Sequence, residues 1–180
     1  RRPFPKVGDF PAGAIARPSA VDFNADGLID LLVNDGGGNV FPFLNVGDRQ
    51  SPQWNVRPTP MTVPWGFAKD LDVSVVTADL DGDETPECLI GNQVLTLRGG
   101  SHSPSGEYRG IVNVGGQPID HPGPGYGDGY LYTWLADWND DGRADLLWGT
   151  QQGNIYLHLK SATNDPTSFE EGELLTVSNG

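Results

Sequence analysis

The feature that most constrains this chain is an acidic string of nine residues that occurs three times. The strings read DFNADGLID from Asp22, DLDGDETPE from Asp79 and DWNDDGRAD from Asp137. Their starts are 57 residues (22 to 79) and 58 residues (79 to 137) apart. A period this regular is typical of a solenoid or a propeller. The spacing of the oxygen-bearing side chains is that by which a tight loop surrounds a hard cation such as Ca²⁺.

We number the positions of each loop from its first aspartate. Side-chain ligands are expected at positions 1, 3, 5 and 9, and a backbone carbonyl ligand at position 7. The expected ligands are Asp22, Asn24, Asp26, Leu28 and Asp30 in the first loop, Asp79, Asp81, Asp83, Thr85 and Glu87 in the second, and Asp137, Asn139, Asp141, Arg143 and Asp145 in the third. Two to three Ca²⁺ ions are predicted.

The acidic strings also fit two alternatives to a calcium loop. The first is a turn rich in Asp and Asn that is capped by its own side chains and holds no metal. The second is an EF-hand, which needs a glutamate at position 12 and flanking helices. Position 12 is Val33, Ile90 or Trp148, so the EF-hand is excluded. In the second loop Glu84 replaces the glycine at position 6, where a left-handed backbone would strain it.

Short apolar runs surround each loop and predict strands. One run precedes the loop, a second follows it, and a third comes after a turn. A less regular fourth strand is expected in each repeat, within Gln53–Val63, Gly110–Val114 and Ser168–Val177. Since no long segment has a helical apolar period, little helix is expected. The sequence therefore predicts an all-β chain, part of a β-propeller with about three four-stranded blades. The approximate repeats are 11–67, 68–125 and 126–180, and 1–10 is expected to be a strand of a preceding blade.

The segments Val21–Val33 and Ala136–Gly149 resemble the FG-GAP/VCBS repeat, as do Gly38–Val40 and Leu44–Gly47 after the first loop. The second repeat departs from the pattern at Glu84 and Glu87. The resemblance spans about three blades. It implies a calcium-binding β-propeller of the kind found in integrin α-subunits, in some fungal lectins and in many secreted bacterial proteins. It does not imply one activity, because a fold is shared by many functions.

Composition excludes some classes of protein. The net charge is −13, and half of the 24 acidic residues lie in the three loops, which argues against a nucleic-acid partner. No apolar stretch is long enough to span a membrane. The single cysteine, Cys88, forms no internal disulfide. Because loops of ordinary calcium affinity fill at millimolar Ca²⁺, an extracellular, secreted or cell-surface location is expected. The start at Arg1 indicates an excised piece of a longer protein.

Other side chains are candidates for a ligand site or for catalysis. His121, Tyr126 and Asp128 lie in one Gly/Pro-rich loop and could supply the base and acid of a polysaccharide β-elimination. Trp54, Trp65 and Tyr126 could stack on sugar rings. The remaining tryptophans, Trp134, Trp138 and Trp148, are expected in the core. His158 is expected to be a packing residue, and His102 to be solvated.

The favoured function is a calcium-stabilised extracellular binding or adhesion module, with carbohydrate as its expected ligand. One alternative is part of a secreted polysaccharide-degrading enzyme, a lyase or a glycoside hydrolase. A second alternative is a structural scaffold of a larger surface protein. The expected partners are a glycan or an extracellular protein, together with the remainder of a larger propeller or another chain.

Overall fold

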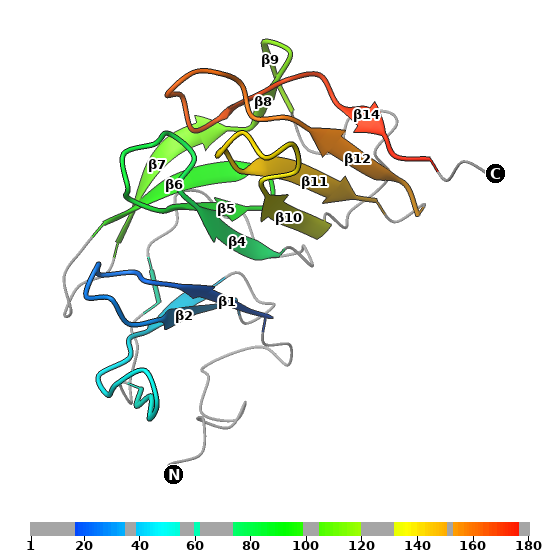
Figure 1. Cartoon of the computed structure of the whole chain (residues 1–180). Coiled ribbons are helices and arrows are strands. Elements are labelled where there is room, and N and C mark those ends of the chain that lie inside the picture. The colour runs from blue at the N-terminus through cyan, green and yellow to red at the C-terminus, as the bar shows by residue number, and fades with distance from the viewer. Residues whose placement is uncertain are drawn as a thin grey trace.

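The computed structural model describes residues 17–34, 39–54, 60–61, 74–98, 105–119, 132–150 and 153–176. Every regular element in these ranges is a β-strand, as predicted (Figure 1). Within them no helix is long and apolar enough to cross a membrane. The expected strand at Phe4–Phe10 lies outside the described residues.

Three antiparallel sheets follow one another along the chain. The first sheet has the order β1-β2-β3, the second β4-β5-β6-β7 and the third β10-β11-β12-β14. Their strands are β1 (Arg17–Val21), β2 (Asp30–Asn34), β3 (Val40–Phe43), β4 (Val75–Ala78), β5 (Glu87–Ile90), β6 (Gln93–Arg98), β7 (Ser105–Ile111), β10 (Tyr132–Ala136), β11 (Asp145–Gly149), β12 (Ile155–His158) and β14 (Glu173–Leu174). The first three strands of each sheet are those that the apolar runs predicted.

Each acidic loop is the connection of the first hairpin of its sheet. The register is the same in all three hairpins, because the residue before the loop pairs with the acidic residue at position 9. The pairs are Val21 with Asp30, Ala78 with Glu87 and Ala136 with Asp145. The repeated sequence therefore gives a repeated hairpin.

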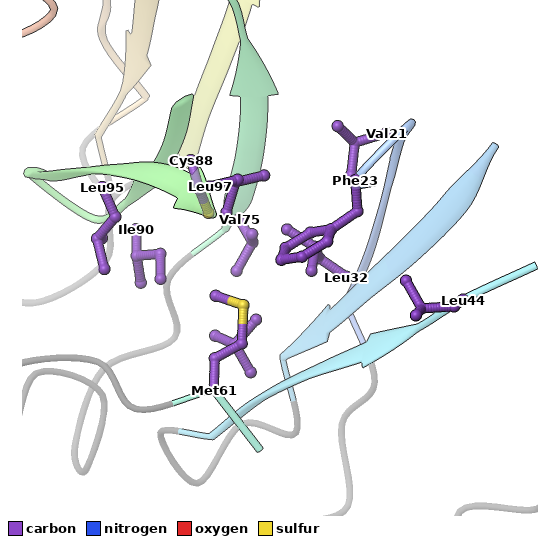
Figure 2. Close-up of a cluster of buried hydrophobic side chains, with 11 residues drawn as sticks. Val21, Phe23, Leu32, Leu44, Met61, Val75, Cys88, Ile90, Leu95 and Leu97 are labelled. Atoms are coloured by element: carbon purple, nitrogen blue, oxygen red, sulfur yellow. The ribbon is translucent and has the colours of Figure 1, made fainter. Parts of the chain in front are cut away.

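The second sheet packs against a neighbour on each face. Cys88 and Ile90 of β5 lie in a buried cluster with Val21 and Leu32 of the first sheet (Figure 2). Leu89, which lies between them in sequence, belongs to a second cluster with Leu146 and Trp148 of the third sheet. Side chains alternate across a strand, so one strand serves both interfaces.

The first strands of successive sheets lie side by side. The hydroxyl oxygens of Ser19 and Thr77 are 3.5 Å apart, and those of Ser74 and Thr133 are 2.6 Å apart. Three sheets stacked through their faces are compatible with adjacent propeller blades. The all-β prediction is confirmed. Because the described residues do not form a closed ring, the propeller itself remains a proposal.

The fourth strand of the third sheet, β14, lies within the predicted segment Ser168–Val177, whereas the first two sheets differ from the prediction. In the second sheet the fourth strand is Ser105–Ile111 rather than 110–114. Residues 113–114 instead form β8, which pairs with β9 (Gln117–Pro118) and, in parallel, with β13 (Ser168–Phe169). In the first sheet the expected segment is represented by two isolated bridges, Asn45 with Trp54 and Val40 with Met61. The outer strands therefore depend on long-range pairing that the local sequence does not specify.

Two of the three tryptophans expected in the core are at the surface. Trp148 is fully buried, whereas Trp134 and Trp138 are more than half exposed. The prediction was wrong for these two residues because they lie on a side of the third sheet that no described element covers. His158 is fully buried and packs edge-on against Trp148, as expected of a packing residue.

Candidate metal centre

The acidic residue at position 9 anchors each loop to its sheet. Asp30 accepts hydrogen bonds from the backbone N–H of Phe23 (3.0 Å) and of Asn45 (2.7 Å). Asp145 accepts the equivalent bonds from Trp138 (2.9 Å) and Lys160 (2.7 Å). In each loop, one of the two bonds comes from a donor within the loop, and the other comes from the backbone that follows the third strand of the sheet.

Glu87 has the same role in the second loop, with one different donor. It accepts from the backbone N–H of Leu80 (2.9 Å) and from the hydroxyl of Thr96 (2.9 Å). Asp30, Glu87 and Asp145 are all buried. Because each carboxylate oxygen has two lone pairs, an oxygen that accepts one N–H can still bind a cation.

The carboxylate at position 1 organises the turn. In the first loop, Asp22 accepts from the backbone N–H of Asp26 (3.1 Å) and of Gly27 (2.8 Å). In the third loop, Asp137 accepts from Asp141 (3.0 Å) and Gly142 (2.9 Å). The corresponding residue of the second loop, Asp79, accepts from positions 4 and 6. These bonds bend each loop around its own side-chain oxygens, which is the arrangement that a calcium loop needs.

Positions 5 and 7 are also linked in every loop. The backbone N–H at position 7, in Leu28, Thr85 and Arg143, donates to the carboxylate at position 5. The asparagine at position 3, Asn24 or Asn139, accepts the N–H of position 5 and donates its amide to the position-5 carboxylate. Hydrogen bonds therefore hold the predicted ligands at positions 5 and 7 close together in every loop.

The second loop brings three carboxylates together. One carboxylate oxygen from each of Asp79, Asp81 and Glu87 lies within 4.8 Å of the other two. Such a group of oxygens suits a hard cation. This is the loop whose sequence departs most from the repeat, and the longer Glu87 side chain still reaches the cluster.

Each loop holds one residue other than glycine in a left-handed backbone conformation. Glu84 at position 6 has φ of 66°, as the sequence predicted. Position 4 is left-handed as well, and there the second loop has Gly82 while the other loops have Ala25 (φ 56°) and Asp140 (φ 61°). The second loop has therefore exchanged which of the two left-handed positions carries the glycine. The strain at position 4 was not foreseen.

Arginines that the sequence did not single out lie at the loops. Arg49 donates through Nε (3.1 Å) and Nη2 (2.9 Å) to the Gly27 carbonyl. Arg109 lies 3.7 Å from the Asp81 carboxylate and donates to Thr96, and Arg143 pairs with Asp141 at 2.7 Å. These guanidinium groups offset part of the negative charge of the loops. Arg109 and Arg143 would compete with a cation for the carboxylates of Asp81 and Asp141.

Burial affects the charge of the anchoring carboxylates. It raises the pKa of Asp30 and of Glu87 above their ordinary values, and the hydrogen bonds that each carboxylate accepts only partly offset this. A nearby divalent cation favours the ionised form and would counter that cost. The donor set of buried and clustered carboxylates therefore fits a bound cation.

A groove of about 470 Å³ separates the first loop from the second. Asn24 and Ala25 lie on one side of it, and Glu84, Thr85 and Arg98 on the other. Apolar side chains, including Phe23 and Leu97, also line it. The groove is open to solvent, and the apolar side chains Phe23 and Leu97 that line it are themselves almost fully buried.

Several other predicted site residues lie outside the part of the chain that the structure describes. They are His121, Tyr126, Asp128 and Trp65, and His102, which was expected to be solvated, lies outside it as well. Trp54 is described and is partly buried against the cluster of Val33, Phe41 and Phe43. Trp54 therefore has a packing role in the first sheet.

Comparison with known families supports the predicted resemblance. Residues 22–90 match the model of the FG-GAP-like repeat. The match begins at the first residue of the first loop and ends with β5 of the second sheet. A search of curated proteins found no match. The match is consistent with an FG-GAP-like repeat in an all-β chain.

Proposed function

We propose that this chain is a calcium-stabilised extracellular binding module whose ligand is a carbohydrate, and that its sheets are blades of a β-propeller. The observation that carries the calcium part is the convergence of Asp79, Asp81 and Glu87 within 4.8 Å. The first and third loops support it through their sequence and their turns, because the carboxylate at position 1 of each accepts backbone N–H groups from the same loop positions. Ca²⁺ takes six to eight oxygen ligands in irregular geometry, whereas Mg²⁺ demands an octahedron.

Calorimetry tests the metal. Titration with Ca²⁺ should show two to three sites per chain, and titration with Mg²⁺ should show weaker binding. Asp81→Asn removes one carboxylate charge from the cluster and should weaken one of the sites. Glu107→Gln is a matched control, because Glu107 is an exposed acid of β7 that pairs with Arg98 outside the loops. Equal or tighter binding of Mg²⁺ would contradict the calcium assignment.

The groove between the first two loops supports a binding role. Its volume is in the range of small-ligand sites, which is about 300–1,000 Å³. Asn24, Glu84 and Arg98 offer donors and acceptors for sugar hydroxyl groups. A ligand seated there would touch both loops, so its affinity would depend on calcium.

A glycan array in Ca²⁺ and in EDTA tests this role. Calcium-dependent binding that Arg98→Ala reduces and Glu173→Ala leaves unchanged would support it, since Glu173 is an exposed acid of the third sheet. Release of unsaturated uronate products from polysaccharides would favour the lyase alternative instead. If the chain shows neither glycan binding nor turnover, the result would favour the scaffold alternative.

A further inference from the structure

His158 is a buried imidazole whose second ring nitrogen has no partner. The side chain is fully buried in the third sheet and lies edge-on to Trp148, with 6.0 Å between the ring centroids. Its Nδ1 lies 3.3 Å from the carbonyl oxygen of Glu170, so Nδ1 carries the proton and donates it. Nε2 is buried and has no hydrogen-bond partner among the described residues. The ring is therefore neutral, because a proton added to Nε2 would be a buried charge without an acceptor.

Residues 170–175, which we call the strap, cover this ring. They contain β14, which lies at the outer edge of the third sheet beside β12 (Figure 1). A Cβ atom added to Gly172 would overlap the imidazole, so the backbone of Gly172 lies directly against the His158 ring. Every residue of the strap is exposed or half-buried, although the ring beneath it is fully buried.

Backbone hydrogen bonds attach the strap to the sheet. β14 pairs with β12 at two positions. The N–H of Glu170 donates to the carbonyl of Leu159 at 2.8 Å. The N–H of Leu175 donates to the carbonyl of Ile155, also at 2.8 Å. A segment with little buried apolar surface opens locally at a low cost in free energy, so the strap can leave the ring while the rest of the sheet stays folded.

The sheet around His158 favours the neutral ring. His158 pairs with Leu146 of β11, which lies with Trp148 in the apolar cluster between the second and third sheets. Asp145, the predicted calcium ligand next to Leu146, points to the opposite face because side chains alternate along a strand. Lys160, two residues further along the chain, donates through its ammonium group to two backbone carbonyls.

The strap meets the ring through backbone atoms, and its acidic side chains, Glu170, Glu171 and Glu173, are exposed. Burial lowers the pKa of His158, and the hydrogen bond to the Glu170 carbonyl only partly offsets this. When the strap opens, water reaches Nε2 and the ring regains its ordinary pKa of about 6.5. The closed strap therefore keeps its full stability above about pH 6.5 and loses stability as the pH falls below that value.

We propose that the strap is an acid-operated cover of His158, which is closed at neutral pH and opens locally when Nε2 takes up a proton. Opening frees the outer edge of β12, whose backbone N–H and C=O groups can then pair with another chain. This inference goes beyond the proposed function, because it requires neither calcium nor a glycan. It also differs from a loss of global stability, because β11 and its neighbours stay folded.

Hydrogen exchange tests the opening. The amides of Glu170 and Leu175 report on the strap, and the amides of β11 report on the rest of the third sheet. The chain is kept in saturating Ca²⁺, and each rate is divided by the rate of an unstructured peptide at the same pH, which gives the open fraction. From about pH 7.5 to about pH 5.5, the open fraction of the strap should rise about tenfold. The β11 amides should remain better protected than the strap at both pH values.

Two variants assign the rise to His158. His158→Phe keeps an aromatic ring but removes the titrating group, so the open fraction of the strap should no longer change with pH in this range. The matched control combines Glu170→Gln, Glu171→Gln and Glu173→Gln. Because glutamates titrate near pH 4.3, at about two units below the histidine, the rise should persist in this control.

Gly172→Ala gives a test that does not depend on the folding of the His158→Phe chain. The added methyl group overlaps the imidazole, so at about pH 7.5 the strap should already be about as open as it is in the natural chain at about pH 5.5. An unchanged open fraction in Gly172→Ala would overturn the proposal. A natural strap that opens equally at both pH values, or that exchanges only together with β11, would overturn it as well, and so would a rise that survives in His158→Phe.

Discussion

Replacing Asp145 by alanine separates the two roles of the acidic loops, which are the anchoring of the loop to its sheet and the proposed binding of calcium. The Asp145 carboxylate is fully buried and accepts the backbone N–H of Trp138 and of Lys160. Alanine leaves both donors without this acceptor, and an unsatisfied buried donor costs about 1–3 kcal/mol. Since the Trp138 amide is only partly buried, we expect Asp145→Ala to lower the free energy of unfolding by about 2–5 kcal/mol even when no calcium is present.

Asp141→Ala is the matched comparison. Asp141 is also a predicted ligand, but its hydrogen bonds to Asn139 and Arg143 are exposed. Exposed interactions of this kind contribute under about 1 kcal/mol. In Ca²⁺ the Asp141→Ala chain should lose the stabilisation that the third ion provides, whereas in EDTA it should resemble the natural chain.

Urea unfolding of the natural chain and both variants, in EDTA and in Ca²⁺, measures these differences. For a chain of this length, each 1 kcal/mol shifts the melting temperature by about 2–4 °C, so a thermal melt gives a second reading. If Asp145→Ala is as stable as the natural chain in EDTA, the anchoring role is refuted. If Asp141→Ala loses as much stability in EDTA as Asp145→Ala does, the separation of the two roles fails.

Three further outcomes are expected. Removing calcium with EDTA should lower the melting temperature, because a ligand at a hundredfold excess over its Kd stabilises the native state by about 2.7 kcal/mol; an unchanged melt would contradict this. Arg143→Ala should tighten calcium binding at the third loop by up to about fivefold, since an exposed competing ion pair is worth up to about 1 kcal/mol; calorimetry would show no change if the pair is irrelevant. Burial lowers the pKa of His158, so the unfolded chain takes up its proton first and stability should fall as the pH drops below about 6.5. In saturating Ca²⁺, His158→Gln should remove part of that fall, and an identical pH dependence in urea unfolding would contradict it.

Several features could be predicted from the sequence because their causes are local. The hairpin around each loop and the left-handed backbone at Glu84 arise within a short stretch of consecutive residues, where backbone geometry leaves few alternatives. The left-handed conformations of Ala25 and Asp140 were not predicted, because neither residue type requires a positive φ. Gly82 in the second loop was the available signal, since glycine readily adopts a left-handed conformation.

The remaining features depend on which segments meet in the folded chain. Lys160 illustrates this, because nothing around it in the sequence predicts a buried lysine, yet its ammonium group donates to the carbonyls of Asp165 and Ser168 at 2.8 Å each. Trp134 and Trp138 show the reverse case. Their apolar character suits burial, but burial also requires a facing sheet. An apolar residue specifies a preference for burial, whereas only the tertiary arrangement supplies the surface that buries it.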